Sequence, residues 1–259
     1  MHICMNRCVI IFSIISAVLA GCRSGQTGLA TLSLPPAPTN LPVNPIAPGL
    51  QSSLTPDYSK FVFPISLDPN QRYLFYLHGK IIEDQGIPAV SPEFGEYQYE
   101  VILDSLAGYG FRVISEPRKK DTNPLAYAKQ IVAQVNDLLR AGVPPGNITV
   151  VGVSKGGGIA ILASNLLGNP DIRYVIMAIC SPDEIAGLKK SGVTLSGKVL
   201  SIYDSADTLA GSCGDLFDFS EGKGLSGSKE IVLNVGTGHG IIYKPLRDWL
   251  QPIREWVIE

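Results

Sequence analysis

A serine flanked by glycines is the first feature of this sequence that could do chemistry. Gly152-Val153-Ser154-Lys155-Gly156 directly follows the apolar run Ile148–Val153 and precedes a helix-like segment. In a G-x-S-x-G turn between a strand and a helix, small flanking residues make room for a strained backbone that exposes the serine. The helix N-terminus behind the serine favours developing negative charge. Ser154 is therefore the candidate nucleophile; the plainer alternative is a structural serine in a glycine-rich turn.

A serine nucleophile needs a base to take its proton, and histidine is the usual one. The chain has 3 histidines, and His2 lies in the N-terminal leader described below. His78 ends an apolar strand-like run, where we expect a structural role. His239 lies in the loop Gly236–Gly240 (GTGHG), just after the last expected strand. His239 is the candidate base, with a surface-loop histidine as the alternative.

Two aspartates could hold the base in its tautomer and stabilise the imidazolium. Asp204 and Asp207 both follow the apolar run Val199–Tyr203. Asp207 lies just past the strand end, from where its side chain could turn back toward the histidine loop. Asp204 is closer to the strand and could instead cap the turn. We therefore predict Asp207 as the acid.

The segment His78-Gly79-Lys80 suggests a site for the oxyanion of a tetrahedral intermediate. The backbone amide of Lys80 would be one donor, and that of Lys155, directly after the nucleophile, the other. A simple turn at Gly79 is the alternative. Residues 80–86 (KIIEDQG) are expected to form a loop near the mouth of the site, with Glu83 and Asp84 solvated.

Strands and helices are expected to alternate from about residue 58 onward. The expected strands are Tyr73–Leu77, Phe111–Ser115, Ile148–Val153, Tyr174–Ile179, Val199–Tyr203 and Ile231–Leu233. The expected helices are Tyr97–Leu106, one capped by Asn123 and ended by Gly142, Gly158–Leu167, Glu184–Lys190, and a C-terminal one divided or kinked by Pro252. Near-continuous apolar strands alternating with helices predict an α/β fold: a doubly wound, mainly parallel sheet with helices on both faces.

The order serine, acid, histidine, preceded by an HG loop, resembles the α/β-hydrolase superfamily. The matching pieces are YLHGK, GVSKG, YDSAD and GTGHG, over roughly residues 60–259. The resemblance implies Ser154, Asp207 and His239 as a catalytic triad and the amides of Lys80 and Lys155 as an oxyanion hole. The short stretch between the fourth and fifth expected strands leaves no room for a large lid, so we expect an open site.

These features predict a serine hydrolase that cleaves small carboxylic esters through an acyl-enzyme on Ser154. The string S-K-G-G is also similar to that of certain acyl-CoA thioesterases, acyltransferases and secreted tripeptidyl peptidases, so a serine peptidase or acyl thioesterase is an alternative. A non-catalytic, lipid-anchored binding protein is another. The Lys155 side chain could bind an anionic substrate group, but we expect it to project into solvent.

The N-terminus has the pattern of a leader. Residues 1–21 contain one Arg and an apolar run of signal-peptide length, ending in Leu19-Ala20-Gly21-Cys22, which resembles the bacterial lipobox. An ordinary secretory signal is the alternative. Lipid, palmitate included, on Cys22 would anchor the chain to a membrane of the bacterial cell envelope, at the periplasmic or outer surface. Residues 22–57 are rich in Pro and are read as a tether, and residues 58–259 as the hydrolase domain.

Cysteine usage and charge complete the sequence predictions. Cys180 and Cys213 could form a disulfide in an exported protein, or remain two buried thiols. The formal net charge is −2 without a basic block, so no nucleic-acid partner is expected. The two histidines of the domain do not make a metal site with scattered carboxylates, so we predict no metal or cofactor, and a small ester or acyl compound as substrate.

Overall fold

The computed structural model describes residues 58–258, so the expected signal peptide, the lipidation site Cys22 and the whole tether (residues 22–57) lie outside the described residues. Its strands are β1 (Tyr73–Leu77), β2 (Val90–Ser91), β3 (Gly95–Glu96), β4 (Arg112–Ile114), β5 (Ile148–Val153), β6 (Arg173–Met177), β7 (Gly197–Asp204) and β8 (Leu225–Leu233). Its α-helices are α1 (Lys80–Gln85), α2 (Tyr99–Ala107), α3 (Pro124–Arg140), α4 (Lys155–Leu167), α5 (Pro182–Lys190), α6 (Gly214–Ser220) and α7 (Arg247–Ile258).

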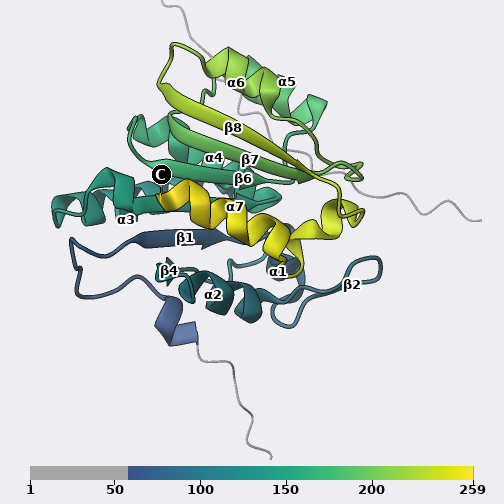
Figure 1. The fold of residues 1–259 in the computed structure, drawn as a ribbon, viewed down its shortest axis with the longest axis horizontal. Coiled ribbons are helices and arrows are strands. Elements are labelled where there is room, and N and C mark those ends of the chain that lie inside the picture. The colour runs from purple at the N-terminus through teal and green to yellow at the C-terminus, as the bar shows by residue number, and fades with distance from the viewer. Residues whose placement is uncertain (1–57, 259) are drawn as a thin grey trace, which may run out of the picture. The chain divides into compact units, whose positions relative to one another are not determined.

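The central sheet has 6 strands in the order β4-β1-β5-β6-β7-β8 (Figure 1). Every neighbouring pair in it is parallel, and β2 and β3 form a separate antiparallel pair. The first strand, β1, lies next to one edge; the chain then adds β4 at that edge, returns to β5 on the other side of β1, and winds out to β8. This order confirms the predicted doubly wound, parallel sheet.

Helices cover both faces of the sheet, as near-continuous apolar strands require. In β1, Leu74 and Tyr76 face a core shared with α2 and α7, whose Trp249 is fully buried. Tyr73 and its alternate neighbours on β1 face the other core, which contains α3 and α4. Figure 1 shows α7 running across the near face of the sheet. Two packed cores thus hold the sheet rigid beneath the site.

Strand register brings two important chain segments to the same sheet edge. Leu77, the last residue of β1, pairs with Gly152 of β5, so His78 and Ser154 both leave the sheet at its carboxyl edge. Asp204, the last residue of β7, pairs with Leu233 at the end of β8. Ligands bind at this edge in open parallel sheets. The glycine-flanked serine and the loops after β1, β7 and β8 therefore emerge on the same side.

Two expectations about individual elements were wrong, and a third was wrong in part. Residues 80–85 form helix α1 instead of a loop, with Ile82 and Glu83 buried. Strand β8 begins at Leu225, six residues before the expected start at Ile231, because exposed polar residues hide its first half from an apolar pattern. Pro252 does not divide α7, which continues through it as one helix, and the kink stays a prediction. Its missing amide donor is therefore tolerated.

The connection between β6 and β7 is short and contains only α5 among its regular elements. Ile185 and Leu188 of α5 pack into the core that holds α3 and α4. The stretch where a lid would be inserted is therefore folded against a side of the sheet.

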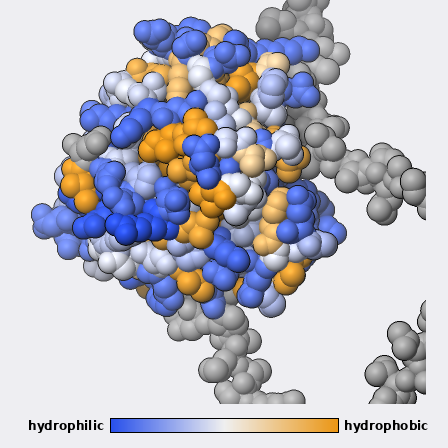
Figure 2. Space-filling model, turned by 45° about the vertical axis from the view of Figure 1, so that its right-hand side comes forward, coloured by the Kyte–Doolittle hydropathy of each residue, from blue (hydrophilic) through white to orange (hydrophobic). Residues whose placement is uncertain are grey.

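The surface carries small apolar areas between hydrophilic ones. Figure 2 shows one such area in the middle of the displayed face, bordered by hydrophilic residues. Apolar atoms make up more than half of most folded surfaces, so this feature does not by itself mark a binding site. Among the described residues, none of the helices has the length and apolar character needed to cross a membrane.

Candidate active site

Ser154 occupies a strained turn between β5 and α4. Its φ is 51° and its ψ is −123°, a conformation that side-chain-bearing residues rarely adopt and that costs about 1–3 kcal/mol. A Cβ at Gly152 would lie 2.2 Å from the Gly156 carbonyl oxygen, and one at Gly156 would lie 1.9 Å from the Leu77 carbonyl oxygen. The two glycines therefore allow the turn to form against β1.

His239, which lies close to Ser154 in space, comes from a much later part of the chain. Its Nε2 lies 3.1 Å from Ser154 Oγ, and its Nδ1 lies 2.9 Å from Asp207 Oδ2. With hydrogen on Nδ1, the ring donates to the carboxylate and accepts from the serine hydroxyl. The His239 side chain is 15% exposed and the Asp207 side chain 0%. The three residues singled out in the sequence thus form one hydrogen-bonded chain.

The Asp207 carboxylate is fixed at both oxygens. Its Oδ1 accepts from the backbone N–H groups of Leu209, at 2.8 Å, and Ala210, at 3.1 Å. Burial alone would raise the pKa of Asp207, but the hydrogen bond and charge of His239 and the two backbone donors together bring it below its ordinary value. The group is therefore an anion that faces the imidazole ring.

Asp204, the other aspartate considered, has a different set of partners. Its Oδ1 accepts from Ala206 N–H at 3.0 Å, and its Oδ2 accepts from Thr237 N–H at 3.0 Å. Asp204 thus ties the turn after β7 to the loop that carries His239. The turn-capping alternative describes Asp204 correctly.

The HG loop after β1 lies beside the serine. A Cβ at Gly79 would be 3.7 Å from Ser154 Cβ, an ordinary contact distance, so the loop passes directly beside the nucleophile. Gly79 is the N-cap of α1, and Lys80 is the first residue of that helix. Lys155 is likewise the first residue of α4. First-turn amides have no acceptor within their own helix, which leaves both N–H groups able to bind an oxyanion.

His78 is buried and neutral. Burial, and then the charge of Arg118, lower the pKa of His78 to about 3. Its Nε2 accepts from the Arg118 backbone N–H at 2.8 Å, so its Nδ1 carries hydrogen and donates to the Gly79 carbonyl oxygen at 2.8 Å. The ring therefore braces the loop at the strand end, in keeping with the expected structural role.

Lys155 and Glu83 differ from the sequence expectation. The Lys155 side chain is 9% exposed and that of Glu83 is 0% exposed, so neither is solvated. Lys155 Nζ donates to Glu83 Oε2 and, at 2.8 Å, to the Thr122 carbonyl oxygen. Asp84, by contrast, is exposed and pairs with the Lys80 side chain. If residues 80–85 had been predicted as a helix, Glu83 and Asp84 would have been expected on different faces of it.

Sequence reasoning missed Phe94, in the hairpin between β2 and β3. Its ring centroid lies 6.5 Å from that of His239, and a Cβ at Gly240 would come within 2.7 Å of its Cδ1. Phe94 therefore forms an apolar wall beside the histidine. The only sequence signal was a Gly at position 95, which has a φ of +77° in the turn.

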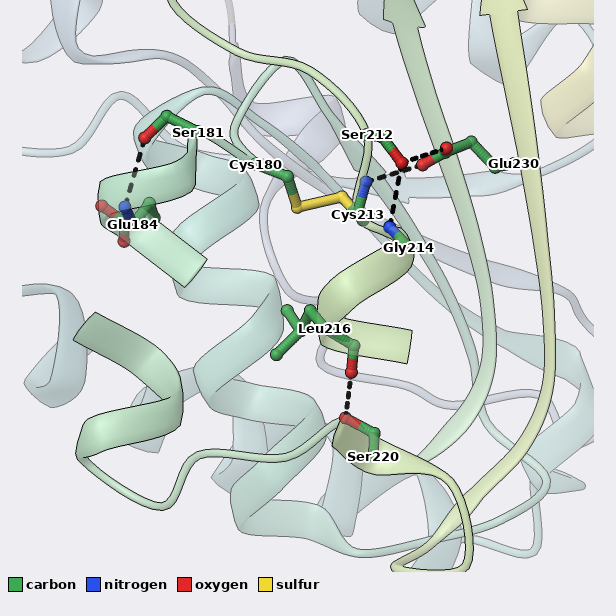
Figure 3. Close-up of a disulfide and its surroundings, with 9 residues drawn as sticks. All are labelled: Cys180, Ser181, Glu184, Ser212, Cys213, Gly214, Leu216, Ser220 and Glu230. Carbon is green, nitrogen blue, oxygen red and sulfur yellow. Dashed lines mark hydrogen bonds between the residues drawn. A yellow bond between two sulfur atoms is a disulfide. The ribbon is translucent and has the colours of Figure 1, made fainter. Parts of the chain in front are cut away.

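Cys180 and Cys213 are joined in a disulfide, with an S–S distance of 2.04 Å (Figure 3). The bond links the segment after β6 to the residue that precedes α6. Gly211 N–H also donates to the Cys180 carbonyl oxygen at 2.8 Å. The disulfide thus anchors the far end of the loop that runs from Asp207 to Cys213.

Within residues 58–258, no group of three or more His, Cys, Asp or Glu side chains is placed to hold a metal ion. The candidate site is thus built from a hydroxyl, an imidazole, a carboxylate and backbone amides. Such groups can carry out acyl transfer.

Comparisons with known proteins give a likeness only among solved structures. No protein-family model matches the sequence, and no curated protein matches it. The chain is similar to Arabidopsis thaliana SOBER1, with 14% identity and a TM-score of 0.49, over 73% of this chain and 98% of that one. It is also similar to an esterase/lipase from an uncultured bacterium, with 13% identity and a TM-score of 0.49, over 73% of this chain and 75% of that one. Likeness at this level carries no information about activity, so the reaction must be inferred from the chain's own residues.

Proposed function

We propose that this chain is a serine hydrolase that cleaves small carboxylic esters through an acyl-enzyme on Ser154. The observation that carries the proposal is the hydrogen-bonded chain Ser154–His239–Asp207, with heavy-atom distances of 3.1 and 2.9 Å. Both distances lie in the range expected of a nucleophile, its base and the group that orients the base.

In the first half of the reaction, Ser154 Oγ attacks the ester carbonyl carbon while its proton moves to His239 Nε2. The carbonyl oxygen becomes an oxyanion, which accepts hydrogen bonds from the N–H groups of Lys80 and Lys155. When the carbon–oxygen bond to the leaving group breaks, His239 returns the proton to the leaving oxygen. An alcohol departs and Ser154 carries the acyl group.

In the second half, water attacks the acyl carbon and gives a proton to His239 Nε2. The tetrahedral intermediate then collapses, the proton returns to Ser154 Oγ, and a carboxylic acid leaves. Asp207 stays ionised throughout, holds hydrogen on Nδ1 and stabilises the imidazolium. Its lowered pKa supports this role.

The surroundings of Ser154 suit the apolar acyl group of a carboxylic ester. Phe94 and Ile242 place apolar carbon close to the catalytic atoms. The side chain of Lys155 is committed to Glu83 and Thr122, so it does not serve as a binding group for an anionic acyl-CoA. No observation in the described residues specifically favours the peptidase or thioesterase alternatives.

We also propose that lipid on Cys22 anchors the chain in the bacterial cell envelope. The lipobox-like sequence suggests this anchor, and the disulfide supports export to an oxidising compartment, where such bonds persist. Cells that express the full chain should incorporate labelled palmitate, and the Cys22→Ser variant should not. Equal labelling of the two would refute the anchor.

Hydrolysis of p-nitrophenyl esters of increasing acyl length by the full-length protein tests the reaction. We expect turnover to be highest for short acyl groups and to fall about 10⁶-fold in Ser154→Ala, as in other triads. Parallel assays with acyl-CoA and peptide substrates address the alternatives. Ester turnover equal in the two proteins would refute the hydrolase proposal and favour a binding protein.

A further inference from the structure

A buried charge cluster lies behind the proposed oxyanion hole. Glu83 accepts from Arg118 Nε at 2.7 Å through one oxygen and from Lys155 Nζ through the other. The exposed fractions of the side chains are 0% for Glu83, 0% for Arg118 and 9% for Lys155. Moving three charges out of water is costly, and a well-packed apolar group is often as stable. The cluster therefore calls for a role besides stability.

One arm of the cluster joins the two helices that begin at the site. Lys155 is the first residue of α4 and directly follows Ser154. Glu83 lies in the first turn of α1, which begins at Lys80. The Lys155–Glu83 ion pair therefore fixes the first turns of α1 and α4 relative to each other. These are the two turns whose leading N–H groups we assign to the oxyanion.

The other arm orients a single peptide plane. Arg118 donates to the His78 carbonyl oxygen through Nη2 and to His78 Nε2 through its backbone N–H. The ring of His78 in turn holds the Gly79 carbonyl oxygen at 2.8 Å. In a planar trans peptide, the position of the Gly79 oxygen determines the direction of the Lys80 N–H. His78 and Arg118 thus set the direction of one proposed oxyanion donor.

We propose that Glu83, with its partners Lys155 and Arg118, is a positioning residue that sets the two oxyanion donors in place. The cluster acts through backbone groups and does not touch substrate. This inference rests on the proposed serine hydrolase function, and it assigns a role to the lysine of the S-K-G-G string.

The test compares three variants of the full-length enzyme with wild type. Lys155→Met removes one arm but leaves the Glu83–Arg118 pair, so the buried charges stay balanced. Lys155→Arg keeps a cation that can reach Glu83. Asp84→Asn is the matched control, since Asp84 is the exposed neighbour of Glu83 on α1. Each variant is assayed for kcat and KM on a p-nitrophenyl ester, for inhibition by a trifluoromethyl ketone, and for its unfolding midpoint.

Loss of a whole oxyanion donor costs about 10²–10³-fold in kcat, so displaced donors should cost about 10–100-fold. We expect this loss in Lys155→Met, with KM within about threefold of wild type. Affinity for the ketone, whose adduct with Ser154 carries an oxyanion, should fall by the same factor as kcat. We expect Lys155→Arg to lie within about threefold of wild type and Asp84→Asn to be unchanged.

Three results would overturn the proposal. A folded Lys155→Met variant with wild-type kcat would assign the cluster to stability alone. A raised KM with unchanged kcat would mean that Lys155 binds substrate. If Lys155→Met does not fold, a folded Lys155→Arg variant that loses more than about tenfold in kcat would show that a cation paired with Glu83 is not enough to position the oxyanion donors. Failure of the hydrolase proposal is seen separately, as ester turnover by wild type no faster than by Ser154→Ala.

Discussion

The two aspartates after β7 provide a sharp test of how the candidate site works. Both side chains are buried, and they lie three residues apart in sequence. Only Asp207 contacts His239, whereas Asp204 holds the turn and the loop that carries the histidine. The substitutions Asp207→Asn and Asp204→Asn remove the same charge from two neighbouring positions. They should nevertheless have very different effects on catalysis.

The expected loss for Asp207→Asn follows from the hydrogen bond at 2.9 Å between Asp207 Oδ2 and His239 Nδ1. An asparagine that keeps its oxygen on the Leu209 and Ala210 amides presents its NH₂ group to Nδ1. The ring must then carry its hydrogen on Nε2, which can no longer accept the Ser154 proton. This tautomer change costs about 10⁴-fold in kcat, or about 5.4 kcal/mol in activation free energy.

The expected loss for Asp204→Asn is mainly one of stability. Its carboxylate accepts from Ala206 N–H, Thr237 N–H and Thr237 Oγ1. A hydrogen bond to a charged group contributes about 1.5–3 kcal/mol, and asparagine retains one acceptor oxygen. We expect the free energy of unfolding to fall by about 2–3 kcal/mol and kcat to fall no more than about tenfold.

The assay is steady-state hydrolysis of a short p-nitrophenyl ester at pH 8, with urea unfolding of each variant to measure stability. Retention of more than a tenth of wild-type kcat by Asp207→Asn would refute the reasoning. So would a larger loss of kcat in a folded Asp204→Asn variant, because that would move the orienting role to the other aspartate.

Three further predictions concern stability. Gly156→Ala should lower the free energy of unfolding, measured by urea titration, by more than about 3 kcal/mol, because its Cβ would lie 1.9 Å from a carbonyl oxygen of β1. Gly158→Ala, whose Cβ would have its nearest atom at 3.9 Å, should be neutral or stabilising. Replacing Cys180 and Cys213 by Ala opens a loop with a sequence separation of 33 and should cost about 4 kcal/mol by the same measurement; a change below about 1 kcal/mol would contradict this. The pKa of His78, lowered from 6.5 to about 3, means that the unfolded chain binds the extra proton between these values. The contribution of neutral His78 to the free energy of unfolding is then fully present above pH 6.5, and it falls by up to about 1.4 kcal/mol per pH unit as the pH drops toward 3. In His78→Asn, the free energy of unfolding should depend less steeply on pH in this range.

The sequence was sufficient to predict most of the sheet because β1, β5 and β6 are buried along their whole length and therefore apolar on both faces. Strand β5 matches its predicted bounds, and the cap of α3 by Asn123 is present, with the side chain accepting from Ala126 N–H at 2.9 Å. The carboxyl-edge rule for parallel sheets then brought the loops after β5, β7 and β8 together. Together with the G-x-S-x-G motif and the small number of histidines, this rule was enough to select Ser154, Asp207 and His239.

The surroundings of these residues were harder to predict because they depend on contacts between distant segments. Glu83 is a charged residue in a segment that reads as a solvated loop. Its burial is explained only by its ion pairs with Arg118 and Lys155, which come from distant parts of the chain. Phe94 lies in a hairpin of two-residue strands, which is too short to show an alternating pattern. Polar residues that are buried for pairing, and very short elements, are thus where sequence periodicity gives least information.

Covalent labelling with a fluorophosphonate probe is the most direct test of the central claim, which is that His239 activates Ser154 for attack on carbonyl carbon. The full-length protein is treated with the probe, digested, and the modified residue identified by mass spectrometry. We predict a single adduct on Ser154, absent in Ser154→Ala and formed at least about 10²-fold more slowly in His239→Gln. An adduct on another serine, or labelling that persists in Ser154→Ala, would contradict the account.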